Sequence, residues 1–263
     1  MAMSNVAGKV ALITGASKGM GRHFVAALAN AGMKVAALAR PSPEFDALPD
    51  EPAVLPLACD VTDPRAVEAA IAATMAQFGR LDVVVANAAI FRPFAFETAS
   101  DADIRDHVEL NLLGVAWTIR AAIPHLRASG GQIVVISSES VRMPFPMLAT
   151  YAATKAAVET LAQGLRDELR SDGIRITVLR SGSVKGGSGG ALWSREATDA
   201  FYRKILATGH AAMSGEAASP ESMAEALLAV IGLPRDIGVD LIEVRAAGEG
   251  LPEGARAVTQ AEQ

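Results

Sequence analysis

With 263 residues, of which 51% are hydrophobic but only 5% aromatic, the chain fits one large domain with a core of small and branched aliphatic side chains. A net charge of -5 without a dense basic cluster argues against a nucleic-acid partner, and no apolar run approaches the ~18 residues of a membrane helix. The only cysteine is Cys59, and the four histidines lack metal-ligand spacing. We therefore expect a cytoplasmic protein with no metal, no nucleic acid and no membrane partner.

Short β-rich apolar runs alternate with longer stretches of helical periodicity, a pattern typical of repeated βαβ units. This predicts an α/β fold, a doubly wound (Rossmann) parallel sheet of about seven strands with helices on both faces. We expect a single domain over residues 1–263, with a flexible substrate loop at about 181–210 and a loose tail at 246–263. The predicted strands are Lys9 to Thr14, Lys34 to Arg40, Ala53 to Cys59, Leu81 to Asn87, Gln132 to Ser137, Arg175 to Leu179 and Val239 to Arg245. The predicted helices are Gly19 to Ala31, Asp63 to Phe78, Asp101 to Ser129, Thr150 to Ser171 and Pro220 to Ile231.

A glycine-rich turn joins the first predicted strand to the first predicted helix. Strand, glycine turn and helix together let backbone N–H groups and the positive end of the helix meet a pyrophosphate. Glycine is required where a side chain would block the phosphate or the close approach of helix to strand. A structural turn is the alternative, but the place of this turn in a first βαβ unit favours dinucleotide binding. The residues concerned are Gly15, Ser17, Lys18, Gly19, Met20 and Gly21.

The end of the second predicted strand indicates which dinucleotide binds. An acidic residue there would accept hydrogen bonds from a free ribose 2'-hydroxyl, but this strand ends in Ala39 and Arg40. Arg40 is placed to fork around a 2'-phosphate, and Lys18 adds a second cation from the glycine turn. The alternative is that both are solvated surface charges. The pair favours NADP(H) over NAD(H) as cofactor.

Tyr151 precedes Lys155 by one helical turn, so that the phenol and the ammonium share one face of a helix. A phenol has a pKa of ~10, and a cation about 5 Å away at an effective dielectric constant of ~20 stabilises the phenolate by roughly 3 kcal/mol, or about two pKa units. Such a shift would bring the tyrosine near neutral pH as a general acid and base. Taken alone, this spacing is a weak motif.

Together these motifs resemble the short-chain dehydrogenase/reductase family over nearly the whole chain. The glycine motif runs from Thr14 to Gly21, and Tyr151 and Lys155 form the last motif. The resemblance implies a catalytic tetrad of Asn111, Ser138, Tyr151 and Lys155. It also implies cofactor contacts from Tyr151 and Lys155 themselves and from Asp60, Val61, Asn87, Ala88, Gly182 and Val184.

The resemblance also implies a role for each member of the tetrad. Tyr151 would protonate the carbonyl oxygen while hydride arrives from the nicotinamide, and Ser138 would hold that oxygen by a hydrogen bond. Lys155 would bind the nicotinamide ribose and lower the tyrosine pKa. Asn111 would anchor a water at a helix kink that links Lys155 to solvent. Taken singly, Asn111 and Ser138 are ordinary polar residues near a core.

The chain departs from the family pattern in three places, one of which is its last predicted strand, Val239 to Arg245, where the family's frequent Asp-Gly-Gly ending is missing. Ala89 replaces a usual glycine beside the cofactor ribose. After the sixth strand, Ser181 replaces the proline that stiffens the turn, and Gly186 replaces the threonine that binds the carboxamide of the nicotinamide. The sequence therefore leaves open which residue holds the carboxamide of the nicotinamide.

The predicted substrate-facing stretches are mainly apolar. They are Ile90 to Phe96, Glu139 to Met147 and the loop with Leu192 and Trp193. Arg92 and Arg142 would meet a substrate carboxylate or lie exposed as ordinary surface residues. The predicted activity is NADP(H)-dependent hydride transfer to and from a small-molecule carbonyl or secondary alcohol, by a homotetramer or homodimer. The alternative is a non-catalytic NADPH-binding redox sensor on the same fold.

Overall fold

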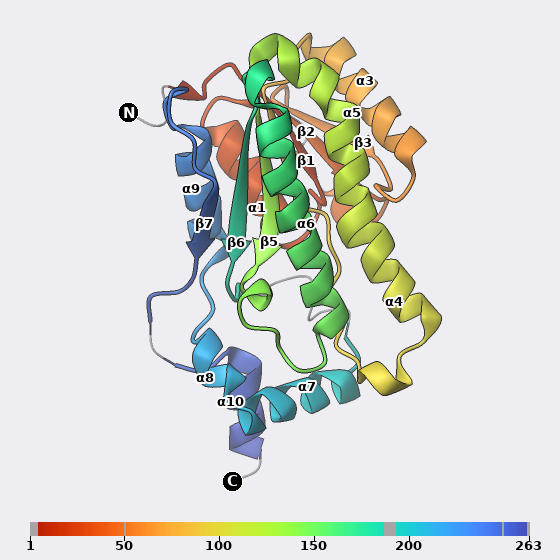
Figure 1. Cartoon of the computed structure of the whole chain (residues 1–263), viewed down its shortest axis with the longest axis vertical. Coiled ribbons are helices and arrows are strands. Elements are labelled where there is room, and N and C mark those ends of the chain that lie inside the picture. Colours follow the sequence, from red (N-terminus) through yellow and green to blue (C-terminus); the bar gives the residue numbers. More distant parts are fainter. Residues whose placement is uncertain (1–4, 50, 187–192, 249, 262–263) are drawn as a thin grey trace.

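The computed structural model describes residues 5–49, 51–186, 193–248 and 250–261. Within this part of the chain, seven parallel strands form one sheet in the order β3-β2-β1-β4-β5-β6-β7 (Figure 1). The predicted single-domain, doubly wound α/β fold is thereby confirmed. The strands are β1 (Val10–Thr14), β2 (Lys34–Ala39), β3 (Val54–Ala58), β4 (Val83–Ala86), β5 (Gln132–Ser138), β6 (Arg175–Ser181) and β7 (Leu241–Val244).

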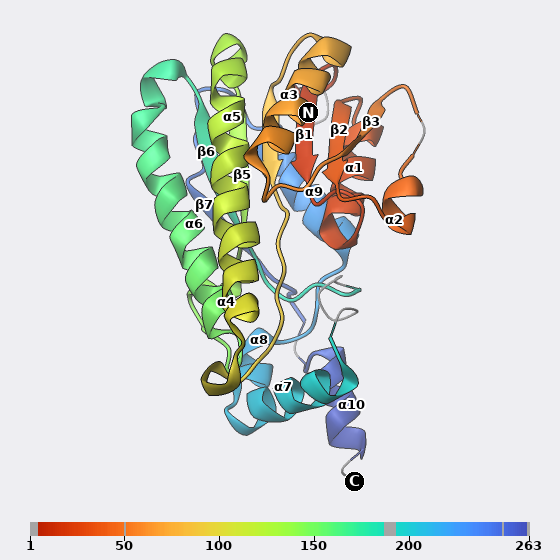
Figure 2. The ribbon, with the colours of Figure 1, turned by 90° about the vertical axis from the view of Figure 1, so that its right-hand side faces the viewer.

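Helices cover both faces of the sheet, each over its own apolar layer (Figures 1 and 2). Successive side chains of a strand point to opposite faces, so that Val84 enters one layer and Val85 the other. Both faces of the central strands are buried, which explains their continuous aliphatic sequence. The first layer packs under α3 (Pro64–Phe78), α5 (Gly114–Ser129) and α6 (Ala149–Glu168), and the second under α1 (Gly19–Asn30) and α9 (Pro220–Ile231).

The order of the strands reverses between β1 and β4. The chain runs outward from β1 to β2 and β3, and then crosses to β4 and runs outward the other way. In open α/β sheets the ligand crevice lies at such a switch point, beyond the carboxyl ends of the strands. The topology therefore sets the place of the site before any side chain is considered.

The long helix predicted from Asp101 to Ser129 is interrupted. It begins as α4 (Asp101–Val108), capped by a reciprocal pair of hydrogen bonds between Ser100 and Asp103. A π-helical turn, η3 (Glu109–Leu113), then separates α4 from α5. Such turns accommodate one extra residue and often lie at functional sites. In this chain the turn contains Asn111.

Three helices stand beyond the carboxyl ends of the strands: α7 (Arg195–Ala207), α8 (His210–Ser214) and α10 (Glu253–Ala261) (Figure 1). Together with the segment before α6 they enclose a third apolar cluster that includes Phe145, Phe201 and Ala255. Much of the expected flexible loop and loose tail is thus helical, because apolar residues at helical spacing, such as Phe201 and Ile205, give those stretches a face to bury. Residues 187–192 of the expected loop lie outside the described residues.

The remaining short elements connect this framework. They are the α2 turn (Pro43–Asp46) after β2 and the 3-10 turns η2 (Phe96–Thr98), η4 (Glu139–Val141) and η5 (Arg170–Asp172). Among the described helices, none is both long enough and apolar enough to cross a membrane.

Candidate active site

A cavity of about 1140 Å³ lies at the switch point, where the strands end. Residues that end or directly follow β1 to β6 line it, among them Gly15, Arg40, Asn87, Ser138 and Ser181. Further predicted site residues on its wall are Ser17, Lys18, Met20, Asp60, Val61, Ala88, Tyr151, Lys155, Gly182 and Val184. The predicted site residues therefore converge on one cavity, although Gly19, Gly21 and Asn111 lie behind its wall.

The glycine turn has the geometry that a pyrophosphate needs. Helix α1 begins at Gly19, its N-cap residue Lys18 makes no capping hydrogen bond with its side chain, and its first turn contains no acidic residue. The N–H groups and the positive end of the helix dipole are thus available to an anion. Gly15 has a φ of +65°, and a Cβ atom there would lie 2.9 Å from the Cα of Ala88. The residues present fit the pyrophosphate of a dinucleotide.

A second glycine lets the turn and the helix approach each other. A Cβ atom on Gly21 would lie only 2.1 Å from the carbonyl oxygen of Gly15 and 2.8 Å from Nδ2 of Asn87. No side chain fits in that space. Gly21 thus shapes the turn from behind rather than contacting the cavity.

Two cationic side chains line the cavity on its β2 side. Arg40 directly follows β2, is exposed and lines the cavity. Lys18 lies on the same wall, where its Nζ is 3.1 Å from the carboxylate of Glu44. Asp60 and Val61, which follow β3, lie on the neighbouring part of the wall, and Oδ1 of Asp60 accepts hydrogen bonds from Thr62.

Asn87 ties the end of β4 to the end of β1. Its Nδ2 donates to the carbonyl oxygens of Thr14 at 2.9 Å and Gly15 at 3.2 Å. The backbone N–H groups of Asn87 and Ala88 both donate to Oγ1 of Thr14 at 3.0 Å. These bonds make the floor of the cavity rigid at the switch point.

Three of the four predicted catalytic residues line the opposite part of the cavity. Ser138 ends β5, and Tyr151 and Lys155 lie one turn apart on α6. Nζ of Lys155 donates to the carbonyl oxygen of Ile136 at 2.8 Å and lies 5.8 Å from the centre of the Tyr151 ring. Lys155 is only 2% exposed.

Burial controls the titration of this pair. Desolvation raises the pKa of Tyr151 to about 12, although a hydrogen bond with Ser138 opposes the rise and the charge of Glu139 adds to it. Burial also lowers the pKa of Lys155 to about 8, against the charge of Glu159. The expected lowering of the tyrosine pKa by the lysine is therefore wrong for the chain by itself, because desolvation of the phenolate is the largest effect and raises the pKa.

Asn111 lies behind the cavity, in the π-helical turn η3. Its Oδ1 accepts from the backbone N–H of Ile90 and its Nδ2 donates to the carbonyl oxygen of the same residue, both at 2.8 Å. Nδ2 also lies 3.2 Å from Oγ1 of Thr154, the residue before Lys155. Asn111 thus connects the end of β4 to α6 rather than contacting a ligand directly.

Aromatic rings form the wall above Tyr151. The ring of Phe91 lies 5.6 Å from that of Tyr151 and 5.0 Å from that of Trp193, which in turn lies 5.2 Å from the ring of Phe201. Trp193 is fixed by a hydrogen bond from its Nε1 to the carbonyl oxygen of Phe91 at 2.8 Å. The wall favours an apolar ligand body beside the tyrosine.

The turn after β6 is held in place without the usual proline. The N–H of Gly182 donates to the carbonyl oxygen of Val244 at 2.8 Å, and Val184 forms a parallel bridge with Ala218. Gly182 also gives room to Arg245, whose Cγ would lie 2.9 Å from a Cβ atom there. The backbone N–H of Lys185 also donates to the carbonyl oxygen of Ala218, so that neighbouring segments restrain this turn as far as Lys185.

Both arginines considered for a substrate carboxylate already have acidic partners. Arg92 pairs with Asp106, and Nη2 of Arg142 lies 3.0 Å from Glu243. Sequence reasoning missed two other parts of the wall. One is formed by Pro252, Gly254 and Ala257 at α10, in a tail without a strong apolar pattern; the other is Ser214 on α8. Glu139 fell within a predicted substrate-facing stretch, but nothing singled it out.

Comparisons with known proteins agree with this geometry. The sequence profile described as short chain dehydrogenase matches residues 9–197. The chain is 30% identical to an uncharacterized oxidoreductase of Staphylococcus saprophyticus over 95% of this chain and all of that protein. It is 38% identical to 11-beta-hydroxysteroid dehydrogenase A of Arachis hypogaea, over 69% of this chain and 54% of the relative. The match thus spans about half the length of that plant protein.

Solved structures show the same fold with bound nicotinamide cofactors. The 3-ketoacyl-(acyl-carrier-protein) reductase from Brucella melitensis, complexed with NADH, has a TM-score of 0.79 at 27% identity, covering 91% of this chain and 97% of that one. The alcohol dehydrogenase from the archaeon Thermococcus sibiricus, complexed with 5-hydroxy-NADP, has a TM-score of 0.77 at 28% identity, with the same coverage. With its profile match, its strand order and the convergence of its motifs on one cavity, the chain belongs to the short-chain dehydrogenase/reductase family of nicotinamide-dependent oxidoreductases.

Proposed function

We propose that the protein is an NADP(H)-dependent oxidoreductase that interconverts a carbonyl compound and its alcohol, with Tyr151 as general acid and base. One observation carries the proposal: Ser138, Tyr151 and Lys155 line the same cavity as the glycine turn and Arg40. A dinucleotide that spans this cavity would reach from Arg40, directly after β2, to Tyr151 on α6. The nicotinamide, when bound, supplies or accepts the hydride.

The residues around the tyrosine favour carbonyl reduction. With a pKa of about 12, Tyr151 keeps its proton at neutral pH and can donate it to the carbonyl oxygen as negative charge develops there. Ser138 donates a hydrogen bond to the same oxygen. Lys155 holds the nicotinamide ribose, and Asn111 supports the chain that returns a proton to the site, as the family resemblance implies.

The preference for NADP(H) rests on Arg40 and Lys18. Both line the cavity on the β2 side, where a ribose 2'-phosphate would lie, and Arg40 is followed by Pro41 and Ser42 rather than by a carboxylate. A guanidinium group can form two hydrogen bonds to a phosphate. Gly15, Ser17, Gly19, Met20 and Gly21 frame the pyrophosphate, while Asp60, Val61, Asn87, Ala88, Gly182 and Val184 flank the two ends of the cofactor.

The aromatic wall indicates the substrate class. Phe91, Trp193 and Phe201 stack edge to face over the tyrosine side of the cavity. A medium-sized, partly hydrophobic ketone or aldehyde would bury its apolar body against these rings and direct its carbonyl to Ser138 and Tyr151.

Absorbance of NADPH during incubation with ketones, aldehydes, hydroxy acids and quinones tests the proposal, with the native chain compared with Tyr151→Phe. We expect turnover that falls by about 10²-fold or more in the variant, because the phenol supplies the proton. Fluorescence of bound NADPH serves as the control and should change little. Tight NADPH binding without Tyr151-dependent turnover of any compound would instead identify a non-catalytic redox sensor.

A further inference from the structure

A buried polar corner interrupts the apolar part of the cavity, directly beside Ser138. Glu139 and Ser140 follow the catalytic serine in η4, and Ser214 reaches the same wall from α8. Their exposed fractions are 4%, 1% and 7%. We call these three residues the Glu139 corner. A carboxylate and two hydroxyl groups buried among aromatic rings require hydrogen-bond partners.

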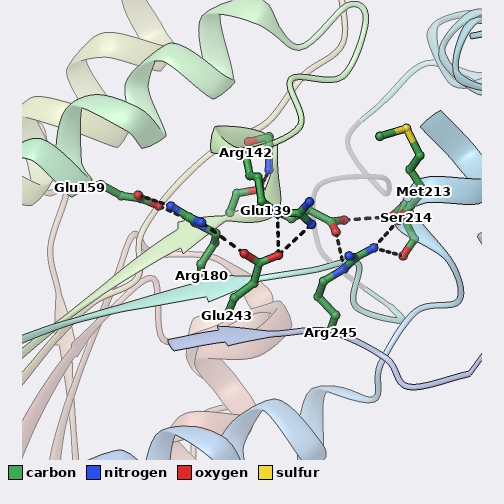
Figure 3. Close-up of polar contacts among 10 residues, drawn as sticks. Glu139, Arg142, Glu159, Arg180, Met213, Ser214, Glu243 and Arg245 are labelled. Carbon is green, nitrogen blue, oxygen red and sulfur yellow. Dashed lines mark hydrogen bonds and ion pairs between the residues drawn. The ribbon is translucent and has the colours of Figure 1, made fainter. Parts of the chain in front are cut away.

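The corner is only partly satisfied by the protein. Oε1 of Glu139 accepts from Oγ of Ser214 at 2.9 Å (Figure 3). Oε2 lies 3.1 Å from Nε of Arg245, but the two groups are not aligned for a hydrogen bond. Among the described residues, Oγ of Ser140 has no hydrogen-bond partner. One carboxylate oxygen and one hydroxyl group of residues that line the cavity therefore lack a hydrogen-bond partner among the described residues.

The surrounding charges balance. Arg180 lies between Glu159, at 2.6 Å, and Glu243, at 3.2 Å (Figure 3). Glu243 also pairs with Arg142, and Glu139 with Arg245. Three carboxylates thus meet three guanidinium groups, so that each carboxylate of this network already has a cationic partner. This arrangement suits a neutral donor better than an ammonium or a carboxylate, since a charged ligand would lack a counter-charge.

The position of the corner is fixed. The guanidinium of Arg245 donates to the carbonyl oxygens of Met213 and Ser214, which ties the segment after β7 to α8. The backbone N–H of Ser140 donates to Oγ of Ser138 at 3.2 Å. The corner therefore holds a constant position relative to the catalytic serine, as a specific subsite requires.

We propose that the Glu139 corner is a substrate subsite that binds a hydroxyl group. The substrate hydroxyl donates to Oε2 of Glu139 and accepts from Oγ of Ser140, while the carbonyl group lies at Ser138 and Tyr151. The substrate class is an otherwise apolar ketone that carries a hydroxyl group away from its carbonyl. This proposal rests on the proposed function.

Matched ketones test the subsite: 2-hydroxyacetophenone, 3-hydroxypropiophenone and 4-hydroxybutyrophenone, each against the phenyl ketone without the hydroxyl group. We expect at least one hydroxyketone to have a kcat/KM about tenfold or more above that of its partner, because a buried polar site discriminates against an analogue that leaves it unpaired. 3-Aminopropiophenone tests the charge argument, and should be a poorer substrate than the hydroxyketone.

Three variants test whether the preference for a hydroxyketone depends on the Glu139 corner. Glu139→Gln and Ser140→Ala should each lower the ratio of kcat/KM between hydroxyketone and partner severalfold, whereas Glu168→Gln, on an exposed part of α6, should leave it unchanged. Ser140→Ala removes a hydroxyl group that has no partner in the described structure, so that folding does not obscure the result. The subsite is refuted if the ratio of kcat/KM is near one for every hydroxyketone in the series. It is also refuted if neither Glu139→Gln nor Ser140→Ala lowers that ratio, or if 3-aminopropiophenone is a better substrate than 3-hydroxypropiophenone. If the chain turns over no carbonyl compound in a Tyr151-dependent manner, the proposed function fails instead.

Discussion

At the scale of the residue, Tyr151 shows how burial and charge compete. The sequence places a lysine one turn away, which predicts a lowered tyrosine pKa, but desolvation raises the pKa of Tyr151 and lowers that of Lys155, so that each is driven toward its neutral form. A neutral phenol suits proton donation. The direction of the pKa shift is therefore consistent with the proposed role of Tyr151 as the proton donor in carbonyl reduction.

The pH dependence of the two directions follows from this pKa. Between pH 6 and 7.5, below the pKa of about 8 of Lys155, the tyrosine is fully protonated. We expect kcat/KM for carbonyl reduction to be constant in this range, whereas kcat/KM for alcohol oxidation, which needs the phenolate, should rise about tenfold per pH unit. Initial rates with saturating cofactor measure both. A reductive kcat/KM that falls steeply as the pH rises from 6 to 7.5 would contradict the assignment.

The second prediction at this scale concerns the recognition of the 2'-phosphate by Arg40. Arg40→Ala should raise the Kd of NADPH by about 10- to 100-fold, the equivalent of a hydrogen bond to a charged group, and change the Kd of NADH little. Quenching of protein fluorescence by each cofactor measures both constants. Arg105→Ala, on an exposed position of α4, serves as the matched control. An equal loss for the two cofactors would show that Arg40 does not recognise the 2'-phosphate.

The sequence identified the candidate site residues that belong to a motif of fixed spacing. Tyr151 and the glycine turn have fixed spacings that chemistry explains. Glu139 and Ser214 have none, because 75 positions separate them and only the packing of α8 against the end of β5 brings them to 2.9 Å. The pKa of Tyr151 was mispredicted for the same reason, since the degree of burial is a property of the folded chain.

At the scale of the element, the junction of β1 and α1 depends on close backbone contact. Gly21→Ala would force a methyl group to within 2.1 Å of the carbonyl oxygen of Gly15. We expect a loss of about 1–3 kcal/mol in the free energy of unfolding, together with weaker binding of NADPH. Denaturant titration and cofactor fluorescence measure the two effects.

Gly164 on α6 provides the control for that substitution. It is exposed, and a Cβ atom there would meet nothing within 4 Å. Gly164→Ala should therefore stabilise the protein by about 0.5–1 kcal/mol, since alanine favours the helix. If the two substitutions changed the free energy of unfolding equally, the close contact between Gly21 and Gly15 would not be the reason for glycine at position 21.

The sequence predicted most elements because alternation and helical periodicity reflect burial directly. It did not predict the division of the helix from Asp101 to Ser129. The one extra residue of a π-helical turn shifts the apolar face by about 100°, and closely spaced apolar residues such as Leu110, Leu112 and Leu113 fit either phase. Helices α7 and α10 were missed because their apolar faces are narrow and become buried only against each other and the segment before α6.

At the scale of the whole molecule, two apolar layers share one sheet, and the cofactor cavity spans six strand ends. We expect the chain to unfold in a single cooperative transition at fixed protein concentration. NADPH at about 100 times its Kd should stabilise the native state by about 2.7 kcal/mol, a rise in Tm of roughly 5–10 °C. Differential scanning calorimetry measures the shift.

The same measurement with NADH distinguishes the cofactors. At equal concentration NADH should raise the Tm much less, because it lacks the phosphate that Arg40 and Lys18 would bind. A larger shift with NADH would contradict the cofactor assignment. The homotetramer or homodimer remains a prediction, which light scattering of the purified protein would test.

Helix α10 has a practical consequence for anyone who handles this protein. Because Pro252, Gly254 and Ala257 belong to the wall of the cavity, the first turns of the last described helix border the space in which a ligand would lie. A purification tag, a fluorescent fusion or a surface tether attached after this helix would be joined to an element of the cavity wall. An attachment before the first strand avoids this, because β1 begins at the end of the sheet opposite to the cavity, and an assay that compares the two attachments would show whether a tag has altered the activity.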